Sequence, residues 1–182
     1  MRVITGTARG RRLLSPDGDN VRPTTDTVKE AVFSIIQFYI KDSVFLDAFA
    51  GSGQMGIEAL SRGADRVYFV DNNRKSLKVT KDNIRLCGLE ENAQVINSDT
   101  LSFLSQTREK FDIVFLDPPY KTGLLQKALE KAAAVTKPEG MIIGEYPVDD
   151  IVPEEIGDFA IKKTYKYGMI HVSIYTHKEV SE

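Results

Sequence analysis

The sequence contains almost no cysteine, since Cys87 is the only one among 182 residues. A single cysteine excludes an internal disulfide and any zinc site built from cysteines. The two histidines lack metal-ligand spacing, so no metal site is expected. No apolar run approaches the roughly 20 residues that span a membrane, and the N-terminus lacks the apolar core of a secretion signal. These absences favour a protein of the reducing cytoplasm without a membrane partner.

The sequence also lacks a strong net charge, which is −2 at pH 7. The overall charge therefore does not indicate nucleic-acid binding, but its distribution is informative. A basic N-terminal end precedes the first acidic residue, Asp17. Such an end is compatible with a local contact to a polyanion, and equally with a solvated basic tail. Its arginines are Arg2, Arg9, Arg11 and Arg12.

Strand-like and helix-like segments alternate regularly after residue 43. Five strands are expected at residues 44–47, 66–70, 93–97, 111–116 and 141–146, with helices between them. This alternation predicts right-handed crossovers and a parallel sheet covered by helices. Two β-rich runs at residues 159–166 and 169–176 then predict an antiparallel hairpin. The expected fold is α/β, a Rossmann-like sheet of seven strands closed by the C-terminal antiparallel hairpin.

A short segment before this sheet is too small to fold alone. Residues 3–6 and 12–14 look like two strands, which predicts a β-hairpin arm, and residues 16–20 form a strong turn signal. The expected organisation is an N-terminal basic arm over residues 1–22 and one domain over residues 23–182.

A helix is expected between the arm and the first strand of the sheet. Apolar residues from Val28 to Tyr39 recur at helical spacing. Thr27 and Glu30 have the spacing of a capping box, which predicts the start of this helix.

The first strand ends in a glycine-rich turn that predicts a cofactor site. Residues 51–56 match G-x-G-x-x-G and Asp71 follows Gly51 by 20 residues, which is the dinucleotide-binding fingerprint. Asp47 argues against a dinucleotide, because it ends the strand where the pyrophosphate would lie and like charges repel. S-adenosylmethionine has no phosphate and carries a positive sulfonium and ammonium. We therefore expect S-adenosylmethionine as the cofactor.

Aspartates end four successive strands, at Asp47, Asp71, Asp99 and Asp117. Asp71 is placed to accept hydrogen bonds from ribose hydroxyls, and Asp99 to accept one from the adenine amino group. Aspartate often only caps a helix N-terminus, but four in succession favour ligand binding.

The fourth strand ends in Asp117-Pro118-Pro119-Tyr120, which predicts the chemical site. Neither proline has an N–H, and each favours an extended conformation in the residue before it. The Asp117 carboxylate and the Pro118 carbonyl can then accept both hydrogens of an exocyclic amine, so that its lone pair faces the methyl group. Tyr120 offers a face on which a flipped-out base can stack. The alternative is a proline-rich turn in which Tyr120 only packs.

Four motifs together resemble the RsmD family of class I methyltransferases, in the same order over nearly the whole chain. They are Arg22-Pro-Thr-Thr-Asp26, Leu46-Asp-Ala-Phe-Ala-Gly-Ser-Gly53, Gly56-Ile-Glu-Ala-Leu-Ser-Arg-Gly-Ala64 and Asp117-Pro-Pro-Tyr120. The resemblance implies methyl transfer from S-adenosylmethionine to N2 of a guanine in bacterial small-subunit ribosomal RNA. It makes residues 23–182 the methyltransferase domain of a cytoplasmic enzyme, which we expect to be a monomer.

The resemblance also implies roles for individual residues. The cofactor would be bound by Asp47, Ala50, Gly51, Gly53, Asp71, Asn72, Asp99 and Asp117. The guanine would be held by Asp117, Pro118, Pro119 and Tyr120. The RNA backbone would be contacted by Arg9, Arg11, Arg12 and Arg22. Because the body of the protein is mildly acidic, the expected substrate is the small subunit or an assembly intermediate rather than naked RNA.

Three other functions fit parts of the sequence. An adenine-N6 methyltransferase acting on DNA or RNA is the nearest, because the tetrapeptide serves either amine. Sequence-specific DNA enzymes usually need a recognition domain, and only the arm is left for one here. A nucleotide-dependent oxidoreductase would use the glycine-rich turn. A non-catalytic RNA-binding or assembly factor would use Asp117 only structurally.

Overall fold

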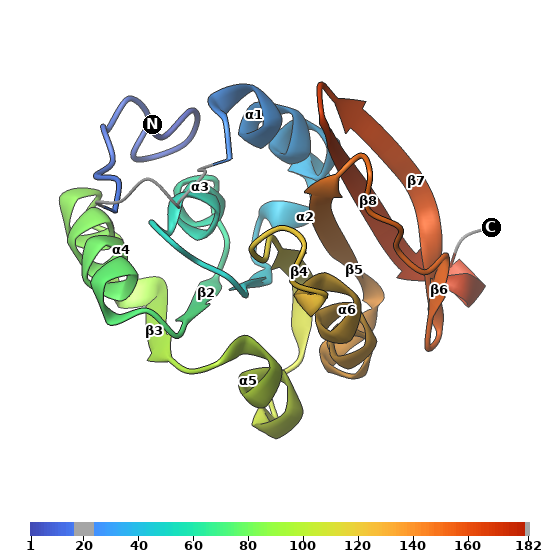
Figure 1. Cartoon of the computed structure of the whole chain (residues 1–182). Helices are drawn as coiled ribbons and strands as arrows, with labels where there is room; N and C mark the ends of the chain where they lie inside the picture. Colours follow the sequence, from blue (N-terminus) through green and yellow to red (C-terminus); the bar gives the residue numbers. More distant parts are fainter. Residues whose placement is uncertain (17–23, 181–182) are drawn as a thin grey trace. The chain divides into compact units, whose positions relative to one another are not determined.

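The computed structural model describes residues 1–16 and 24–180 and divides into two units, Met1–Asp99 and Thr100–Glu182 (Figure 1). Two features predicted from the sequence lie outside the described residues, namely most of the turn at residues 16–20 and Arg22. Within the described residues, no helix is long and apolar enough to cross a membrane.

The first unit is built on three parallel strands in the order β3-β2-β1. Phe45 and Leu46 of β1 and Phe69 of β2 are fully buried, as expected for parallel strands covered on both faces. The elements are α1 (Asp26–Ile35), α2 (Gln37–Ile40), β1 (Val44–Asp47), α3 (Gln54–Ser61), β2 (Arg66–Asp71), α4 (Arg74–Leu86), the short 3-10 helix η1 (Glu90–Asn92) and β3 (Ala93–Asn97).

The second unit has the strand order β4-β5-β8-β7-β6, in which only β4 and β5 pair in parallel. The helix α6 lies against β4 and β5 (Figure 1), and Leu125 and Leu129 of α6 contact the face of β5 at Gly144. The elements are α5 (Thr100–Gln106), β4 (Phe111–Leu116), α6 (Leu124–Val135), β5 (Thr136–Pro147), β6 (Glu155–Ile156), β7 (Phe159–Tyr167), β8 (Ile170–His177) and the 3-10 helix η2 (Lys178–Val180).

Residues 1–16 and 24–180 contain eight strands, where the sequence predicts seven. The additional strand is β6, whose two residues pair with the start of β7 through Glu155↔Ala160 and Ile156↔Phe159. A two-residue strand shows no alternation of apolar and polar residues, so the hydrophobic pattern cannot reveal it.

The helix before β1 begins earlier than predicted and is interrupted. Its N-cap is Thr25, which is extended and accepts a hydrogen bond from the Val28 N–H at 3.3 Å. The predicted cap at Thr27 is wrong, because Thr27 already lies inside α1. At Ile36 the backbone leaves helical geometry, so that α2 is a separate turn.

The N-terminal arm is held by side chains of α3 and by pairing between its own two ends. The Glu58 carboxylate is fully buried and accepts hydrogen bonds from the N–H groups of Ile4 at 2.9 Å and Thr5 at 3.0 Å. The Ser61 hydroxyl accepts one from the Ala8 N–H at 3.0 Å.

The two predicted arm segments pair as a hairpin, through an antiparallel bridge between Arg2 and Arg12. The Val3 N–H donates to the Arg11 carbonyl at 2.9 Å, and the Leu13 N–H to the Met1 carbonyl at 3.1 Å.

Contact between the arm and α3 is close enough to require glycine in the arm. Gly6 has φ +94°, and a Cβ there would lie 1.8 Å from the Ser61 carbonyl oxygen. On the other side of the arm, the buried ammonium of Lys29 donates to the Arg2 carbonyl at 2.6 Å. Burial lowers the pKa of Lys29. The arm therefore lies against α1, α3 and α4 in a fixed path (Figure 1).

Replacing Glu58 by alanine tests this anchoring. The change leaves the N–H groups of Ile4 and Thr5 without their acceptor, and we expect a loss of about 2–4 kcal/mol in the free energy of unfolding in urea. We also expect faster trypsin cleavage after the arm arginines. Glu30→Ala, at an exposed position on α1, is the control and should change neither quantity. An arm that resists trypsin equally well in Glu58→Ala would contradict the anchoring.

Candidate functional site

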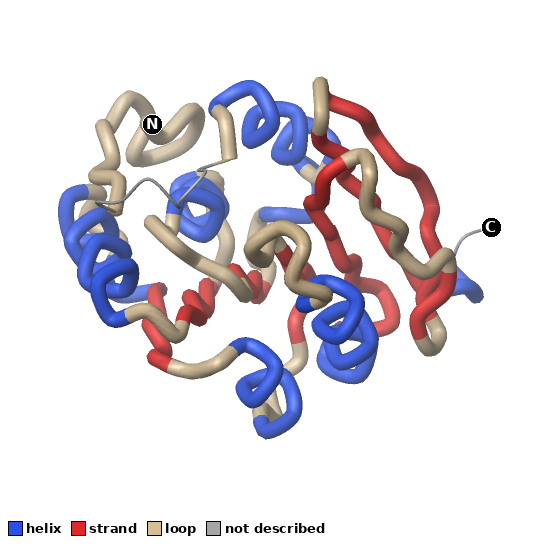
Figure 2. Tube along the Cα trace, viewed as in Figure 1, coloured by secondary structure: helices blue, strands red, loops and turns tan. Residues whose placement is uncertain are grey.

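The turn between β1 and α3 is drawn as a loop in Figure 2. Hydrogen bonds to the end of β2 order this turn. The Ala50 N–H donates to the Val70 carbonyl at 3.0 Å, and the Gly51 N–H donates to Asp71 Oδ2 at 2.9 Å. Gly51 and Gly53 have φ of +56° and +80°, a region that side chains disfavour. A Cβ on Gly51 would meet no atom within 4 Å. The turn therefore presents bare backbone to open space, as close approach of a ligand requires.

Two buried polar side chains of α4 hold the carbonyl groups of the same turn. Thr80 Oγ1 donates to the Gly51 carbonyl at 2.8 Å, and Asn83 Nδ2 donates to the Ser52 carbonyl at 2.9 Å. The sequence analysis missed both residues. A signal existed, because Ser76, Thr80 and Asn83 recur at helical spacing and form a buried polar stripe on α4.

Asp47 is a buried carboxylate at the end of β1, with 1% of its surface exposed. Its Oδ2 accepts the Gly56 N–H at 3.0 Å, so it also serves the first turn of α3. Burial disfavours the charged form and raises the pKa of Asp47 to about 7, although the Gly56 N–H acts in the opposite direction. A nearby positive ligand would restore the charged form. This environment suits a cationic group and opposes a phosphate.

Asp71 holds the cofactor turn by hydrogen bonds and can accept further hydrogen bonds from a ligand. Its Oδ2 bonds the Gly51 N–H, and its Oδ1 accepts the Asn73 N–H at 2.8 Å. A carboxylate has about four acceptor positions, so two remain for ribose hydroxyls. Asn72 and Asp99 are exposed. Asp99 follows β3, which pairs with β2 through Asp71↔Asn97.

The structure therefore brings the predicted cofactor residues of the first unit to the carboxyl ends of β1, β2 and β3. They are Asp47, Ala50, Gly51, Gly53, Asp71, Asn72 and Asp99. Bare backbone, a carboxylate that favours a cation and acceptors for hydroxyls fit S-adenosylmethionine. Dinucleotide pyrophosphate does not fit, because Asp47 would face it.

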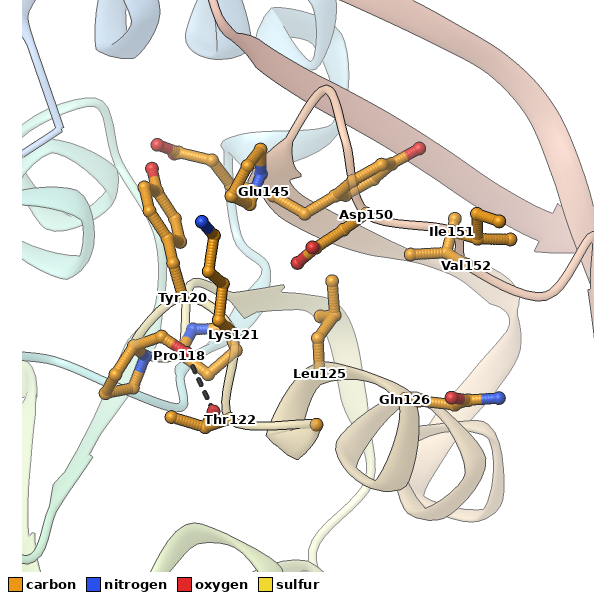
Figure 3. Close-up of a pocket in the computed structure, with 14 residues that line it drawn as sticks. Pro118, Tyr120, Lys121, Thr122, Leu125, Gln126, Glu145, Asp150, Ile151 and Val152 are labelled. Atoms are coloured by element: carbon orange, nitrogen blue, oxygen red, sulfur yellow. Dashed lines mark hydrogen bonds between the residues drawn. The ribbon is translucent and has the colours of Figure 1, made fainter.

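The predicted chemical site lies in the second unit, directly after β4. Pro118 is buried, Asp117 and Tyr120 are half-buried, and Pro119 is exposed. The segment from Pro118 to Tyr120 forms one wall of a pocket of about 310 Å³ (Figure 3). This volume is at the lower end of the range for small-molecule pockets, roughly 300–1,000 Å³.

The turn after the tetrapeptide is tightly constrained. The Thr122 hydroxyl donates to the Pro119 carbonyl at 2.8 Å (dashed in Figure 3). Lys121 and Gly123 both have positive φ, at +59° and +73°, and Gly123 is the N-cap of α6. A rigid turn of this kind holds Pro118 and Tyr120 in place for a ligand.

The opposite wall of the pocket contains an acid that the sequence analysis missed. Glu145, near the end of β5, lines the pocket and is 3% exposed. Acids at the ends of four strands are among the predicted site residues, and the fifth strand follows the same pattern. Applied to residues 141–146, this pattern identifies Glu145.

The arm arginines Arg9, Arg11 and Arg12 are exposed, so they are available to a polyanion. His171 and His177 pack edge-on against Tyr146 and Phe159, which gives them a structural role. No group of three or more metal-ligating side chains gathers within the part of the chain that the structure describes.

Comparisons with known proteins place this geometry in context. A family model described as Conserved hypothetical protein 95 matches residues 1–176. The Haemophilus influenzae protein named Ribosomal RNA small subunit methyltransferase D is 37% identical, over 96% of this chain and 93% of that protein. The Escherichia coli K12 protein of the same name is 33% identical, over 100% of this chain and 92% of that protein. The solved structure of Escherichia coli yhhF matches with a TM-score of 0.87 and 34% identity, over 97% of each chain.

The buried acid Asp47 generates a prediction about stability. Its pKa of about 7 in the folded protein lies above the ordinary value of 3.8. Between these values the folded state holds a proton that the unfolded chain releases, so this group lowers stability as pH rises from 4 through 7. Asp47→Asn keeps an acceptor for the Gly56 N–H and removes this pH dependence. At pH 8 we expect the free energy of unfolding of the variant to be higher than that of wild type, by an amount on the order of 1–4 kcal/mol. This difference should shrink toward pH 4.

Urea unfolding of both proteins at pH 8, 6 and 4.5 measures this difference. Asp65→Asn, at an exposed position, should follow wild type throughout. If the free energies of unfolding of wild type and Asp47→Asn change with pH in parallel, burial does not raise the pKa of Asp47.

Proposed function

The chain belongs to the RsmD family of class I methyltransferases, and from this premise we propose its reaction. It transfers a methyl group from S-adenosylmethionine to the exocyclic N2 amine of a guanine in small-subunit ribosomal RNA. The relatives named above as small-subunit methyltransferases support the RNA class. The main support for methylation of an amine is the pocket that residues 118–120 line.

Residues of the first unit bind and orient the cofactor. The Asp47 carboxylate balances the positive charge of the cofactor, and this charge in turn favours the ionised form of Asp47. Asp71 accepts hydrogen bonds from the ribose, while the backbone at Gly51 allows close approach. When bound, S-adenosylmethionine supplies the electrophilic methyl group.

Residues of the second unit hold the amine that receives the methyl group. Asp117 and the Pro118 carbonyl each accept one N–H of the amine, which turns the nitrogen lone pair away from the base plane. Tyr120 stacks on the base. Transfer would form an N–C bond as the S–C bond of the methyl donor breaks, and the amine would then lose one proton. The Asp117 carboxylate already accepts that N–H and is placed to receive the proton. Catalysis is mainly positioning and electrostatics.

RNA binding begins at the anchored arm. Exposed Arg9, Arg11 and Arg12 supply phosphate contacts that weaken as salt rises. Because the net charge of the chain is −2, the electrostatic attraction to RNA comes from these local contacts. Contacts with a folded ribosomal surface supply the remaining binding energy. The preferred substrate is accordingly the small subunit or an assembly intermediate.

Transfer of a labelled methyl group tests the proposal, with undermethylated small subunits, naked ribosomal RNA and duplex DNA as substrates. After digestion to nucleosides, we expect label in N2-methylguanosine, most of it from the subunits. Asp117→Ala should reduce transfer by at least about 100-fold, while affinity for S-adenosylmethionine stays within a few-fold. Glu130→Ala, at an exposed position on α6, is the matched control and should retain full activity.

Other outcomes separate the alternatives. Label in N6-methyladenine would replace the guanine assignment by adenine-N6 methylation. Cofactor binding without label in any substrate would favour a non-catalytic assembly factor. Full turnover by Asp117→Ala would contradict the role given to the carboxylate.

A further inference from the structure

The pocket beside the tetrapeptide contains a second buried acid that the reaction above does not use. We propose that Glu145 recognises the target base by accepting the N1–H of guanine, and thereby excludes adenine. This inference rests on the proposed function and identifies what selects its substrate.

The pairing of β4 with β5 brings Glu145 next to the amine site. The two strands run parallel with Leu116 opposite Gly144, so the residues that follow, Asp117 and Glu145, occupy corresponding positions. Neighbouring strands lie about 4.8 Å apart, and residues in parallel register point to the same face. An amine held by Asp117 therefore has Glu145 as its lateral neighbour.

The position of Glu145 in the pocket wall is that of a ligand contact. Glutamate is rarely buried as deeply as the 3% exposure found here unless it has a specific partner. Glu145 does interact within the protein, and a carboxylate has about four acceptor positions, so one partner does not use them all. Figure 3 shows its carboxylate directed toward the hydroxyl end of Tyr120, the residue on which the base would stack.

The chemistry of the two bases makes this position selective. Guanine presents two adjacent donors on its Watson–Crick edge, the N1–H and the N2 amine. A second acceptor beside Asp117 matches this pair. Adenine presents an acceptor, N1, beside its N6 amine. A carboxylate facing adenine N1 would set two acceptors against each other, and a group left unpaired in a buried site is costly.

A donor on the same pocket completes the match to guanine. Lys121 lines the pocket, and Figure 3 shows its ammonium group directed into the space between Tyr120 and Asp150. The O6 carbonyl of guanine accepts from such a group, whereas adenine, with its N6 amine at Asp117, presents only C2–H there. The pocket thus offers two acceptors, Asp117 and Glu145, and one donor, Lys121. This order matches the N2 amine, the N1–H and the O6 carbonyl of guanine.

Asp150 is the other acid of this pocket and serves as a matched comparison. It lies on the loop after β5, where its N–H donates to the Pro147 carbonyl at 3.0 Å. Asp150 has no position in register with Asp117, so we assign it no contact with the base. Replacing either acid by its amide changes charge and hydrogen bonding with little change in shape.

The test uses the full chain and reconstituted small subunits whose RNA carries guanine or 2-aminopurine at the methylated position. 2-Aminopurine keeps the reactive 2-amine but has an acceptor in place of the N1–H. For wild type, we expect this substitution to lower kcat/KM by roughly 10- to 100-fold. 2-Aminopurine also lacks O6, and the loss of that contact with Lys121 affects both enzymes. For Glu145→Gln, whose amide can donate to N1, we expect lower activity on guanine and a ratio between the two bases at least about three-fold smaller than in wild type. Asp150→Asn should keep the wild-type ratio.

The ratio between two substrates is independent of the fraction of folded enzyme, so a partly unfolded variant still reports on recognition. An unchanged ratio in Glu145→Gln, with wild type methylating guanine, would overturn the role of Glu145 and leave the proposed function intact. Methylation of adenine by wild type would overturn both.

Discussion

Hydrogen bonds between strand-end carboxylates and backbone N–H groups are the interactions on which the cofactor site depends. Asp47 binds the Gly56 N–H and Asp71 binds the Gly51 N–H, at 3.0 and 2.9 Å. Each bond joins the end of a strand to the glycine-rich turn or to the helix after it. The two carboxylates therefore fix the turn, one of them buried beneath it and the other partly exposed at the end of β2. Charge-assisted bonds of this kind are stronger than neutral ones.

The arm and the cofactor turn share a common support. Asn83 binds the Ser52 carbonyl in the turn and both the N–H and the carbonyl of Leu14 at the end of the arm. Glu58 and Ser61 of α3 hold the earlier part of the arm. One helix pair thus fixes both the proposed RNA-binding segment and the glycine-rich turn. A change in the position of the arm would be transmitted to that turn through Asn83.

Local sequence patterns predict the central elements well, because hydrophobic periodicity and turn residues within each segment determine them. The bounds of β1, β3 and β4 are those expected from the hydrophobic pattern, and the match to yhhF over 97% of the chain confirms the class I methyltransferase fold. The errors involve contacts between distant residues. Glu58 binds the Ile4 N–H across 54 positions, and no local pattern indicates that this helix anchors the arm. Thr80 and Glu145 differ from this case, because the polar spacing on α4 and the acid near the end of β5 are both visible in the sequence.

Equilibrium binding of S-adenosylmethionine and NADH to wild-type protein tests the central claim most directly. That claim is that acids at the strand ends form a site for a cationic cofactor without phosphate. The account predicts saturable binding of S-adenosylmethionine, no displacement by an excess of NADH, and weaker binding by Asp47→Asn. Tighter binding of NADH than of S-adenosylmethionine would contradict it and restore a nucleotide-dependent oxidoreductase as the function.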